Sequence, residues 1–392
     1  MRVASTTGRG RAEELLARVP LVDGHNDLPW ALRDLARGDE FGEKSTADAP
    51  VVSASPVSVV DLEVRQPALQ TDLVRARDGR LGMQFWSVWV PCRLAGDAAV
   101  TAVLEQVELV HDLAARYPAH LRIATTADEA ERAFRDGRIA SLIGAEGGHS
   151  INGSLGVLRA LRRLGVRYMT LTHNENTPWA DSATDEPVHG GLTDFGRDVV
   201  REMNRVGMLV DLSHVAPSTM RDALEVSTRP VVFSHSSCRA VADHPRNVPD
   251  DVLARLRDND GVCMVTFVPQ FLSQAYVDWD GRLREAMEVA GENHNDLEAR
   301  HRFADEWPAA GPTPRVTMED VITHLEHARE VAGIDHIGLG GDYDGTRSLP
   351  EGMEDVSCYP DLLGALLDRG WSEDDCAKLA GLNALRVLRA ND

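Results

Sequence analysis

The chain has 392 residues, of which 43% are hydrophobic and 26% are charged, so it can bury a globular core and is not disordered as a whole. Its 62 acidic residues outnumber its 41 basic residues, and the formal net charge is −21. Because nucleic acids and anionic lipids are polyanions, a charge of this sign excludes them as expected partners.

The cysteine and lysine counts limit which structural sites and catalytic mechanisms the chain can use. Five cysteines without a CxxC pair argue against a disulfide scaffold or a zinc knuckle and favour reduced thiols in a cytoplasmic protein. Only Lys44 and Lys378 are lysines, and neither follows a predicted strand. Mechanisms that need a Schiff-base lysine, or a carbamoylated lysine between two metals, are therefore nearly excluded.

The termini and the hydropathy predict no membrane attachment. Residues 1–24 contain arginines but lack the apolar centre of a signal peptide, and no segment approaches the ~18 apolar residues of a membrane span. The final residues, RVLRAND, lack the hydrophobic tail of a lipid-anchor signal. We expect a cytoplasmic protein without a membrane anchor.

Eight short apolar runs predict strands, in chain order, at 21–27, 83–90, 139–147, 166–173, 208–214, 230–236, 261–268 and 336–342. Helical periodicity between them predicts amphipathic helices that include 97–117, 156–165, 193–207, 217–227 and 317–333. Eight strand–helix units predict an α/β fold, a (β/α)8 TIM barrel. An open doubly wound sheet is the alternative, because periodicity does not reveal closure.

Two stretches do not fit the repeat. Residues 38–67 have the Asp, Ser, Gly and Pro content of a loop. Residues 270–316 separate the last two predicted strands and carry acidic and aromatic residues. We interpret both as insertions on one barrel, so a single domain over residues 1–392 is expected.

Metal-binding residue types gather where the predicted strands end. Because all C-terminal strand ends of a parallel barrel open onto one face, where active sites are built, these residues should converge. Alternation along the first strand points His25 and Asp27 to the barrel mouth and Asn26 away from it. The full set, in chain order, is His25, Asp27, Glu146, His173, His214, His235 and Asp342.

The donor set suits two metal ions. His25 and Asp27 can hold one ion, and the Glu146 carboxylate can bridge to a second ion bound by His214 and His235. This matches a pair of zinc ions ~3.5–4 Å apart, which can share and activate a hydroxide. Since no lysine follows a strand, a glutamate is the remaining candidate for the bridge.

The remaining histidines and cysteines are expected to be structural. His324 and His327 lie three residues apart in a predicted helix without an HExxH motif, and we place both on the helix surface. His149 follows Glu146 closely and could support a metal ligand. Cys238 has no nearby thiol and is expected to be a buried cysteine.

Nine motifs occur along nearly the whole chain, in this order: VDGHNDLPW, QFWSVWVP, GAEGG, LTHNENTPWADS, VDLSHV, FSHSSCRAV, RNVPDDVL, GGDYDG and EGMEDVSCYPDLL. With these motifs the sequence resembles the membrane dipeptidase (renal dipeptidase) family of zinc metallopeptidases in the amidohydrolase superfamily. The resemblance implies a metal-dependent barrel hydrolase that cleaves dipeptides, in some members with a C-terminal D-residue. Relatives suggest a homodimer, whereas the lipid-anchored tail of mammalian members is missing here.

Matching these motifs residue by residue implies a role for each site residue. One zinc would be held by His25, Asp27 and Glu146, and the other by Glu146, His214 and His235. His173 would contact the scissile carbonyl, Arg246 the substrate's terminal carboxylate, and Asp342 would transfer the proton. Asp344 shares the face parity of Asp342 and is its nearest rival.

Two alternative functions stay open at the level of sequence. A barrel of the same fold could hydrolyse another amide, a lactam or an ester. A catalytically inactive barrel could instead bind a peptide or a metal as a sensor, although the intact ligand set and Asp342 argue against this.

Overall fold

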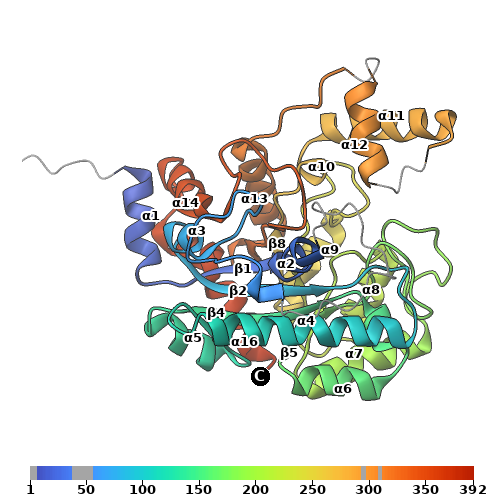
Figure 1. The fold of residues 1–392 in the computed structure, drawn as a ribbon, viewed down its shortest axis with the longest axis horizontal. Coiled ribbons are helices and arrows are strands. Elements are labelled where there is room, and N and C mark those ends of the chain that lie inside the picture. The colour runs from blue at the N-terminus through green and yellow to red at the C-terminus, as the bar shows by residue number, and fades with distance from the viewer. Residues whose placement is uncertain (1–6, 38–55, 293–296, 308–310) are drawn as a thin grey trace, which may run out of the picture.

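The computed structural model describes residues 7–37, 56–292, 297–307 and 311–392 (Figure 1). Its strands are β1 Leu21–Asn26, β2 Leu81–Trp89, β3 Leu121–Ile123, β4 Ile139–Glu146, β5 Val166–Thr170, β6 Leu209–Asp211, β7 Val232–Phe233, β8 Val262–Val265 and β9 Ile337–Leu339. All of these strands pair in parallel, in the order β2-β1-β9-β8-β7-β6-β5-β4-β3.

A further pairing, between β2 and β4, closes the sheet. Eight of the nine strands form the resulting ring. The ninth, β3, lies outside it and pairs only with the first half of β4. The predicted TIM barrel is therefore confirmed, and the open doubly wound sheet is wrong. The sequence did not predict β3, whose three residues are too few to show a period.

Helices surround this barrel (Figure 1). They are α1 Gly8–Leu16, α2 Leu28–Arg37, α3 Leu73–Asp78, α4 Asp97–Arg116, α5 Ala127–Arg135, α6 Leu155–Arg163, α7 Asp194–Val206, α8 Pro217–Val226, α9 Asp250–Asn259, α10 Pro269–Leu272, α11 Gln274–Ala290, α12 Leu297–Glu306, α13 Met318–Ala332, α14 Tyr359–Asp368, α15 Glu373–Ala377 and α16 Asn383–Ala390. Short 3-10 turns occupy Pro56–Ser58, Gly148–Ile151, Ile334–His336 and Val356–Cys358, and Lys378–Leu382 form a π-helix. All five predicted helices lie where periodicity placed them.

Side-chain caps fix where several helices begin. Thr126 and Thr193 accept hydrogen bonds from backbone N–H groups three residues later, at the starts of α5 and α7. Thr317 and Asp320 form a capping box at α13. Each cap satisfies N–H groups that a helix leaves unpaired at its first turn and so fixes the residue at which that helix begins.

The strands that carry the candidate site end earlier than predicted. His173, His214, His235 and Asp342 lie two or three residues beyond the last residue of β5, β6, β7 and β9. Backbone conformation is one cause, because His214 has φ +70° and Asp342 has φ +62°, which no strand accommodates. These residues therefore sit on the loops at the barrel mouth.

The segment between β8 and β9 contains the helices α10 to α13. Helices α11 and α12 project away from the barrel in Figure 1 and bury a small apolar cluster of their own, made by Trp279, Leu283, Met287 and Ala299. Most of the other predicted insertion, 38–67, lies outside the described residues. The organisation of residues 1–392 as a single domain stays a prediction.

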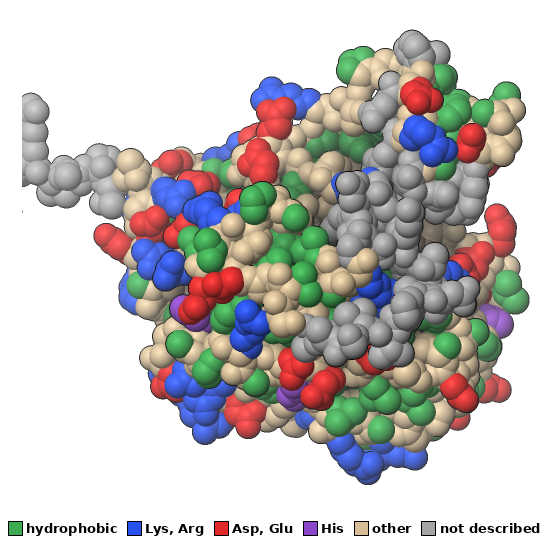
Figure 2. All heavy atoms as spheres, viewed as in Figure 1, with side chains coloured by type: hydrophobic (Ala, Val, Ile, Leu, Met, Phe, Trp, Pro, Cys, Tyr) green, Lys and Arg blue, Asp and Glu red, His purple; other side chains and the backbone are tan. Residues whose placement is uncertain are grey.

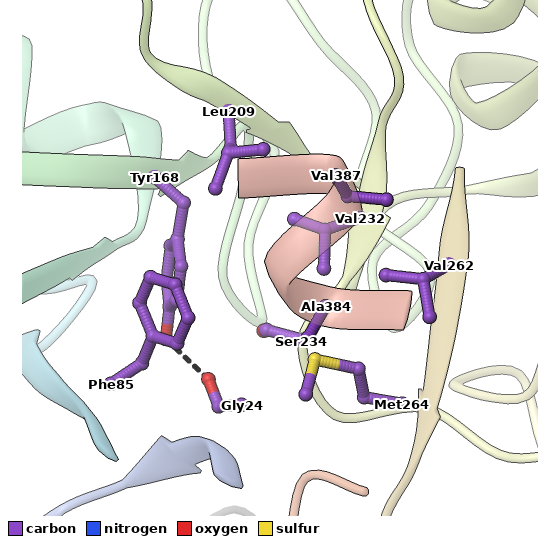
Figure 3. A pocket seen from close by; sticks show the side chains of 10 residues that line it. All are labelled: Gly24, Phe85, Tyr168, Leu209, Val232, Ser234, Val262, Met264, Ala384 and Val387. Atoms are coloured by element: carbon purple, nitrogen blue, oxygen red, sulfur yellow. Dashed lines mark hydrogen bonds between the residues drawn. The ribbon is translucent and has the colours of Figure 1, made fainter. Parts of the chain in front are cut away.

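The barrel interior is apolar below the site. Helix α16 closes the end where the strands begin, and its residue Ala384 packs with Val232 and Met264 in one buried cluster. A small cavity remains between α16 and the strands (Figure 3). The opposite end of the barrel is thereby left for the loops that carry polar residues.

Three further features bear on the expectations from sequence. Within the described residues, no helix is both long enough and apolar enough to cross a membrane. All five cysteines are free thiols, and Cys238 is buried as expected. The space-filling view in Figure 2 shows acidic and basic side chains interspersed over the visible face, so the excess of acidic residues forms no single patch there.

Candidate metal centre

The carboxylate of Glu146, the last residue of β4, lies at the centre of the converging side chains. Its Oε2 is 3.5 Å from His25 Nε2, while its Oε1 is 2.9 Å from His214 Nε2 and 3.4 Å from His235 Nε2. Ser87 of β2 donates a hydrogen bond to Oε2 at 3.1 Å. The two oxygens thus face two different groups of imidazoles.

His25 and Asp27 flank one side of Glu146. The His25 Nε2 atom lies 3.3 Å from Asp27 Oδ2, and the ring's Nδ1 lies 2.8 Å from the hydroxyl of Tyr168. Asn26 instead donates to Thr71 Oγ1 at 2.8 Å, away from this group. The alternation inferred from the sequence therefore matches the observed directions of the three side chains.

His214 and His235 flank the other side. Their Nε2 atoms are 2.9 Å apart. Two nitrogens that bind one zinc ion at 2.0–2.1 Å in a tetrahedron lie ~3.3 Å apart, so only a small adjustment would bring both onto one ion. The rings of His25 and His235 also lie close, with centroids 3.8 Å apart.

Charge and burial make this group a candidate cation site. Burial would raise the pKa of Glu146, but the imidazoles of His25, His214 and His235 outweigh it and hold that pKa well below its usual range. Burial lowers the pKa of His214 and of His235 well below the ordinary value, so both rings are neutral. Burial would lower the pKa of His25 as well, but Tyr168, Glu146 and Asp27 outweigh it and raise that pKa well above the ordinary value. Neutral His214 and His235 beside several carboxylates form a donor set for divalent metals.

The residues present fit a metal on a second criterion, their unsatisfied atoms. His25 Nε2 and Asp27 Oδ1 are buried without a hydrogen-bond partner among the described residues. Because a buried polar atom without a partner costs free energy, such atoms call for a ligand. In each of three groups of side chains, the ligand atoms lie within 4.8 Å of one another. The groups are His25, Glu146 and His235; Glu146, His173 and His214; and His25, Asp27 and Asp342.

Asp342 reaches this group and Asp344 points elsewhere. Asp344 Oδ1 accepts a hydrogen bond from the backbone N–H of Gln70 at 2.7 Å. A Cβ atom on Gly345 would lie 2.3 Å from Asp342 Oδ1 and 2.2 Å from Asp27 Oδ2, so the turn requires glycine there. Burial raises the pKa of Asp342 to about 8, with Asp27 adding to the effect.

His173 borders the site from the loop after β5. Its Nε2 lies 3.8 Å from Glu146 Oε1, its Nδ1 lies 3.4 Å from Cys92 Sγ, and the edge of Trp89 packs against its ring. Burial lowers the pKa of His173 to about 4. The ring is therefore neutral near pH 7 and can donate only one hydrogen bond.

Arg246 comes from the long loop between β7 and α9 and is only 3% exposed. Its guanidinium lies over the ring of Phe271, 5.2 Å from the centroid, and its Nη2 lies 3.5 Å from the backbone carbonyl of His235. Nη1 has no hydrogen-bond partner among the described residues. Burial lowers the pKa of Arg246 to about 10, which leaves it charged at neutral pH.

Two buried aspartates that sequence reasoning missed hold the strands behind the site. Asp23 Oδ1 accepts the backbone N–H of His25 at 2.9 Å and of Gly341 at 3.0 Å, joining β1 to the end of β9. Asp211 Oδ1 does the same for Ser213 at 3.1 Å and Ser234 at 2.9 Å. A signal existed in the sequence, since each aspartate lies two or three residues before a candidate ligand histidine.

Residues near the site that were expected to be structural differ in outcome. His149 lies against Gly147, beside Glu146 in the chain, and its supporting role stays a prediction. The expectation that His324 lies on a helix surface is wrong, because it is fully buried and its Nδ1 accepts the N–H of Cys238 at 3.0 Å. His327 is partly exposed, and its Nε2 lies 2.8 Å from Asp250 Oδ1.

Comparison with known proteins identifies the family of the chain. The model of the membrane dipeptidase family (peptidase family M19) matches residues 9–392. A relative, dipeptidase verJ of Clonostachys rogersoniana, is 39% identical over 390 residues, which cover 96% of this chain and 86% of the relative. This chain therefore belongs to the membrane dipeptidase family and is a hydrolase of the metallo-dipeptidase class.

Solved structures share the fold. The probable dipeptidase PvdM from Pseudomonas aeruginosa has a TM-score of 0.80 at 22% identity, with 98% of both chains covered. A metallopeptidase from Rhodobacter sphaeroides, liganded with a phosphinate mimic of the dipeptide L-Ala-D-Ala, has a TM-score of 0.74 at 23% identity. That match covers 95% of this chain and 99% of the other.

Proposed function

We propose that this chain is a binuclear zinc dipeptidase that hydrolyses free dipeptides, including those with a C-terminal D-residue. The observation that carries the proposal is the Glu146 carboxylate, whose Oε2 faces His25 while its Oε1 faces His214 and His235. A carboxylate with its two oxygens directed at separate donor groups is suited to bridge two ions. His25 and Asp27 would complete one ion's ligands, and His214 and His235 the other's.

Zinc ions bound there would supply Lewis acidity and would lower the pKa of a bound water from ~15.7 toward ~7. The residues around them bind the substrate, orient it and move protons. Their positions relative to Glu146 decide which role each one can take.

Arg246 binds the substrate's C-terminal carboxylate in this proposal. A planar guanidinium matches a carboxylate with two parallel hydrogen bonds, and Arg246 Nη1 has no other partner among the described residues. Burial of the side chain strengthens such a bond, because water does not compete for it. The site would thus select short substrates with a free C-terminus.

His173 and Asp342 act on the scissile bond. Neutral His173 directs Nε2 toward the site, 3.8 Å from Glu146, and donates a hydrogen bond to the oxygen of the peptide carbonyl. Asp342 takes a proton from the attacking water and returns it to the departing amine, because the positive charge of the bound ions would lower its raised pKa and keep it ionised. Asp342 is preferred to Asp344 because Asp344 is bonded to the backbone of Gln70.

The D-residue part of the proposal is supported by the phosphinate mimic of L-Ala-D-Ala bound to the Rhodobacter sphaeroides relative. The contacts that would distinguish L- from D-residues are set by the loops of the mouth. A stereochemically paired library of dipeptides, assayed for release of free amino acids, tests this part directly.

Metal analysis of the active protein combined with a substrate panel tests the whole proposal. The expected result is two zinc ions per chain and hydrolysis of free dipeptides, with N-blocked dipeptides, dipeptide amides and lactams poor or inert. Hydrolysis confined to a lactam or another amide would replace the substrate class. Tight dipeptide binding without hydrolysis would indicate the non-catalytic barrel, and active protein without a bound divalent cation would refute the metal centre.

A further inference from the structure

A chain of buried groups lies behind His235 and takes no part in the proposed reaction. Ser234 Oγ is 2.8 Å from His235 Nδ1, and it donates a hydrogen bond to Asp211 Oδ2 at 2.5 Å. The carboxylate of Asp211 is held in turn by the backbone N–H groups of Ser213 and Ser234. The three side chains in this chain are 0–1% exposed.

The hydrogen-bond directions in this chain follow from the chemistry of the carboxylate. Burial raises the pKa of Asp211, but its Oδ1 accepts two backbone N–H groups, which stabilise the ionised carboxylate. An ionised carboxylate only accepts, so the single hydroxyl proton of Ser234 points at Asp211. The lone pairs of Ser234 Oγ are then directed at His235 Nδ1, which must supply the proton of that bond. A neutral imidazole with its proton on Nδ1 has an unprotonated Nε2.

We propose that Asp211 and Ser234 are positioning residues that keep the proton of His235 on Nδ1 and thereby leave Nε2 free to bind a metal ion. The proposal rests on the metal-binding role of His235 put forward above. The hydrogen bond made by the nitrogen that faces away from the metal fixes both the tautomer and the ring orientation of a ligand histidine. His235 Nε2 is directed at the site, 3.4 Å from Glu146 Oε1.

The surroundings leave Ser234 few other partners. It borders the cavity inside the barrel, and of the ten residues that line this cavity only Ser234 and Tyr168 have polar side chains (Figure 3). Low polarity strengthens a hydrogen bond, so the Asp211–Ser234–His235 chain is held in one arrangement. Tyr168 offers a parallel, because its hydroxyl donates to Gly24 O at 3.2 Å and also lies against His25 Nδ1.

Asp23 provides a natural control within the same barrel. It accepts two backbone N–H groups, as Asp211 does, and its third donor is the hydroxyl of Tyr359. That hydroxyl has no imidazole partner among the described residues, and its ring packs against Phe267 and Tyr343. Asp23 thus joins two strands without controlling a histidine proton.

The test is the substitution Asp211→Asn, which keeps the shape and reverses the proton order. The asparagine Nδ2 would donate to Ser234 Oγ, so the serine proton would turn to His235 Nδ1 and the imidazole proton would move to Nε2. Metal-free protein labelled with ¹⁵N-histidine should show His235 protonated on Nδ1 in the wild type and on Nε2 in Asp211→Asn. Zinc Kd, measured by competition with a chromophoric chelator, should rise ~10–100-fold.

Matched variants separate this role from a purely structural one. Ser234→Thr keeps the hydroxyl and should keep the zinc Kd, whereas Ser234→Ala should raise it. Asp23→Asn should lower the melting temperature without changing the His235 tautomer. An Nε2 proton on His235 in the metal-free wild type would overturn the proposal. Equal losses of zinc affinity in Asp211→Asn and Asp23→Asn, with an unchanged tautomer, would overturn it too.

One more variant distinguishes an error in this proposal from an error in the proposed metal centre. His235→Ala should weaken zinc binding more than any change at Asp211 or Ser234. Unchanged zinc binding in His235→Ala would refute the ligand assignment itself, and with it this proposal. The tautomer measurement in metal-free protein concerns only the positioning pair.

Discussion

The assignment of Arg246 to the substrate's carboxylate makes a quantitative prediction. The side chain is 3% exposed, and its Nη1 has no hydrogen-bond partner among the described residues. A hydrogen bond to a charged group contributes ~1.5–3 kcal/mol, so two bonds from the guanidinium would contribute ~3–6 kcal/mol. Since 1.36 kcal/mol corresponds to a factor of ten, a free dipeptide should exceed its C-terminal amide in kcat/KM by roughly 10²–10⁴-fold.

Removing the guanidinium should remove that preference. In Arg246→Met, kcat/KM for the free dipeptide should fall by roughly 10²–10⁴-fold, while the value for the dipeptide amide should change little. Arg246→Lys keeps the charge without the planar fork and should lie between the two. The assay is the rate of amino acid release from each acid and amide pair, followed by chromatography.

The same change at a neighbouring arginine is the control. Arg239 lies in the same loop, where it donates to the backbone carbonyls of His244 and Pro245 at 3.3 Å and 2.7 Å. Arg239→Met can shift the loop but should leave the ratio of acid to amide near the wild-type value. Wild-type protein that hydrolyses the amide as fast as the acid, or an unchanged ratio in Arg246→Met, would refute the reasoning.

Four further predictions concern the reaction, the metal, the barrel interior and the pH dependence. Asp342→Asn should lower kcat by ~10²–10⁴-fold with zinc still bound, because general acid–base catalysis is lost, and near-normal turnover would remove Asp342 from the mechanism. Chelation should abolish hydrolysis, and added zinc should restore it. At a free zinc concentration of 100 times Kd, each site should raise the free energy of unfolding by ~2.7 kcal/mol, and calorimetry in which zinc leaves the melting temperature unchanged would contradict this. Gly144→Ala should destabilise the protein by ~1–3 kcal/mol, because the alanine Cβ would lie 2.0 Å from the ring of Tyr168. It should also weaken zinc binding, because the Tyr168 hydroxyl contacts His25. Denaturant unfolding measures the change in stability, and a stability equal to that of the wild type would show that the ring moves freely. Burial lowers the pKa of His324 to about 4. Between pH 6.5 and 4 this histidine is therefore protonated in the unfolded chain but not in the folded one, so the free energy of unfolding should fall by ~3 kcal/mol as the pH falls. His324→Asn, which keeps an acceptor for Cys238, should flatten that acid limb of the curve of melting temperature against pH, and an unchanged limb would contradict the assignment.

The local patterns of the chain determined the alternation of strands and helices and the positions of the ligand candidates. The apolar runs of the barrel strands are buried on both sides, and the amphipathic segments between them form helices because one face of each must be covered. The residues with metal-binding side chains could be found because parallel strands end on one face whatever the details of their packing. That rule connects His25 with Asp342, which are more than 300 residues apart in the sequence.

Other features depended on distances that no local pattern contains. The barrel closes through the pairing of β2 with β4. The hydrophobic pattern of these two strands would be the same in an open sheet, so the sequence did not reveal this contact. The burial of His324 depended on which face of α13 meets the barrel. Asp211 and Ser234 looked like ordinary polar residues of a strand end until β6 and β7 were brought together, because a hydrogen bond between side chains depends on ångström-scale separation. Sequence therefore determined the kinds of groups at the mouth, and tertiary structure decided which atom of each group faces which partner.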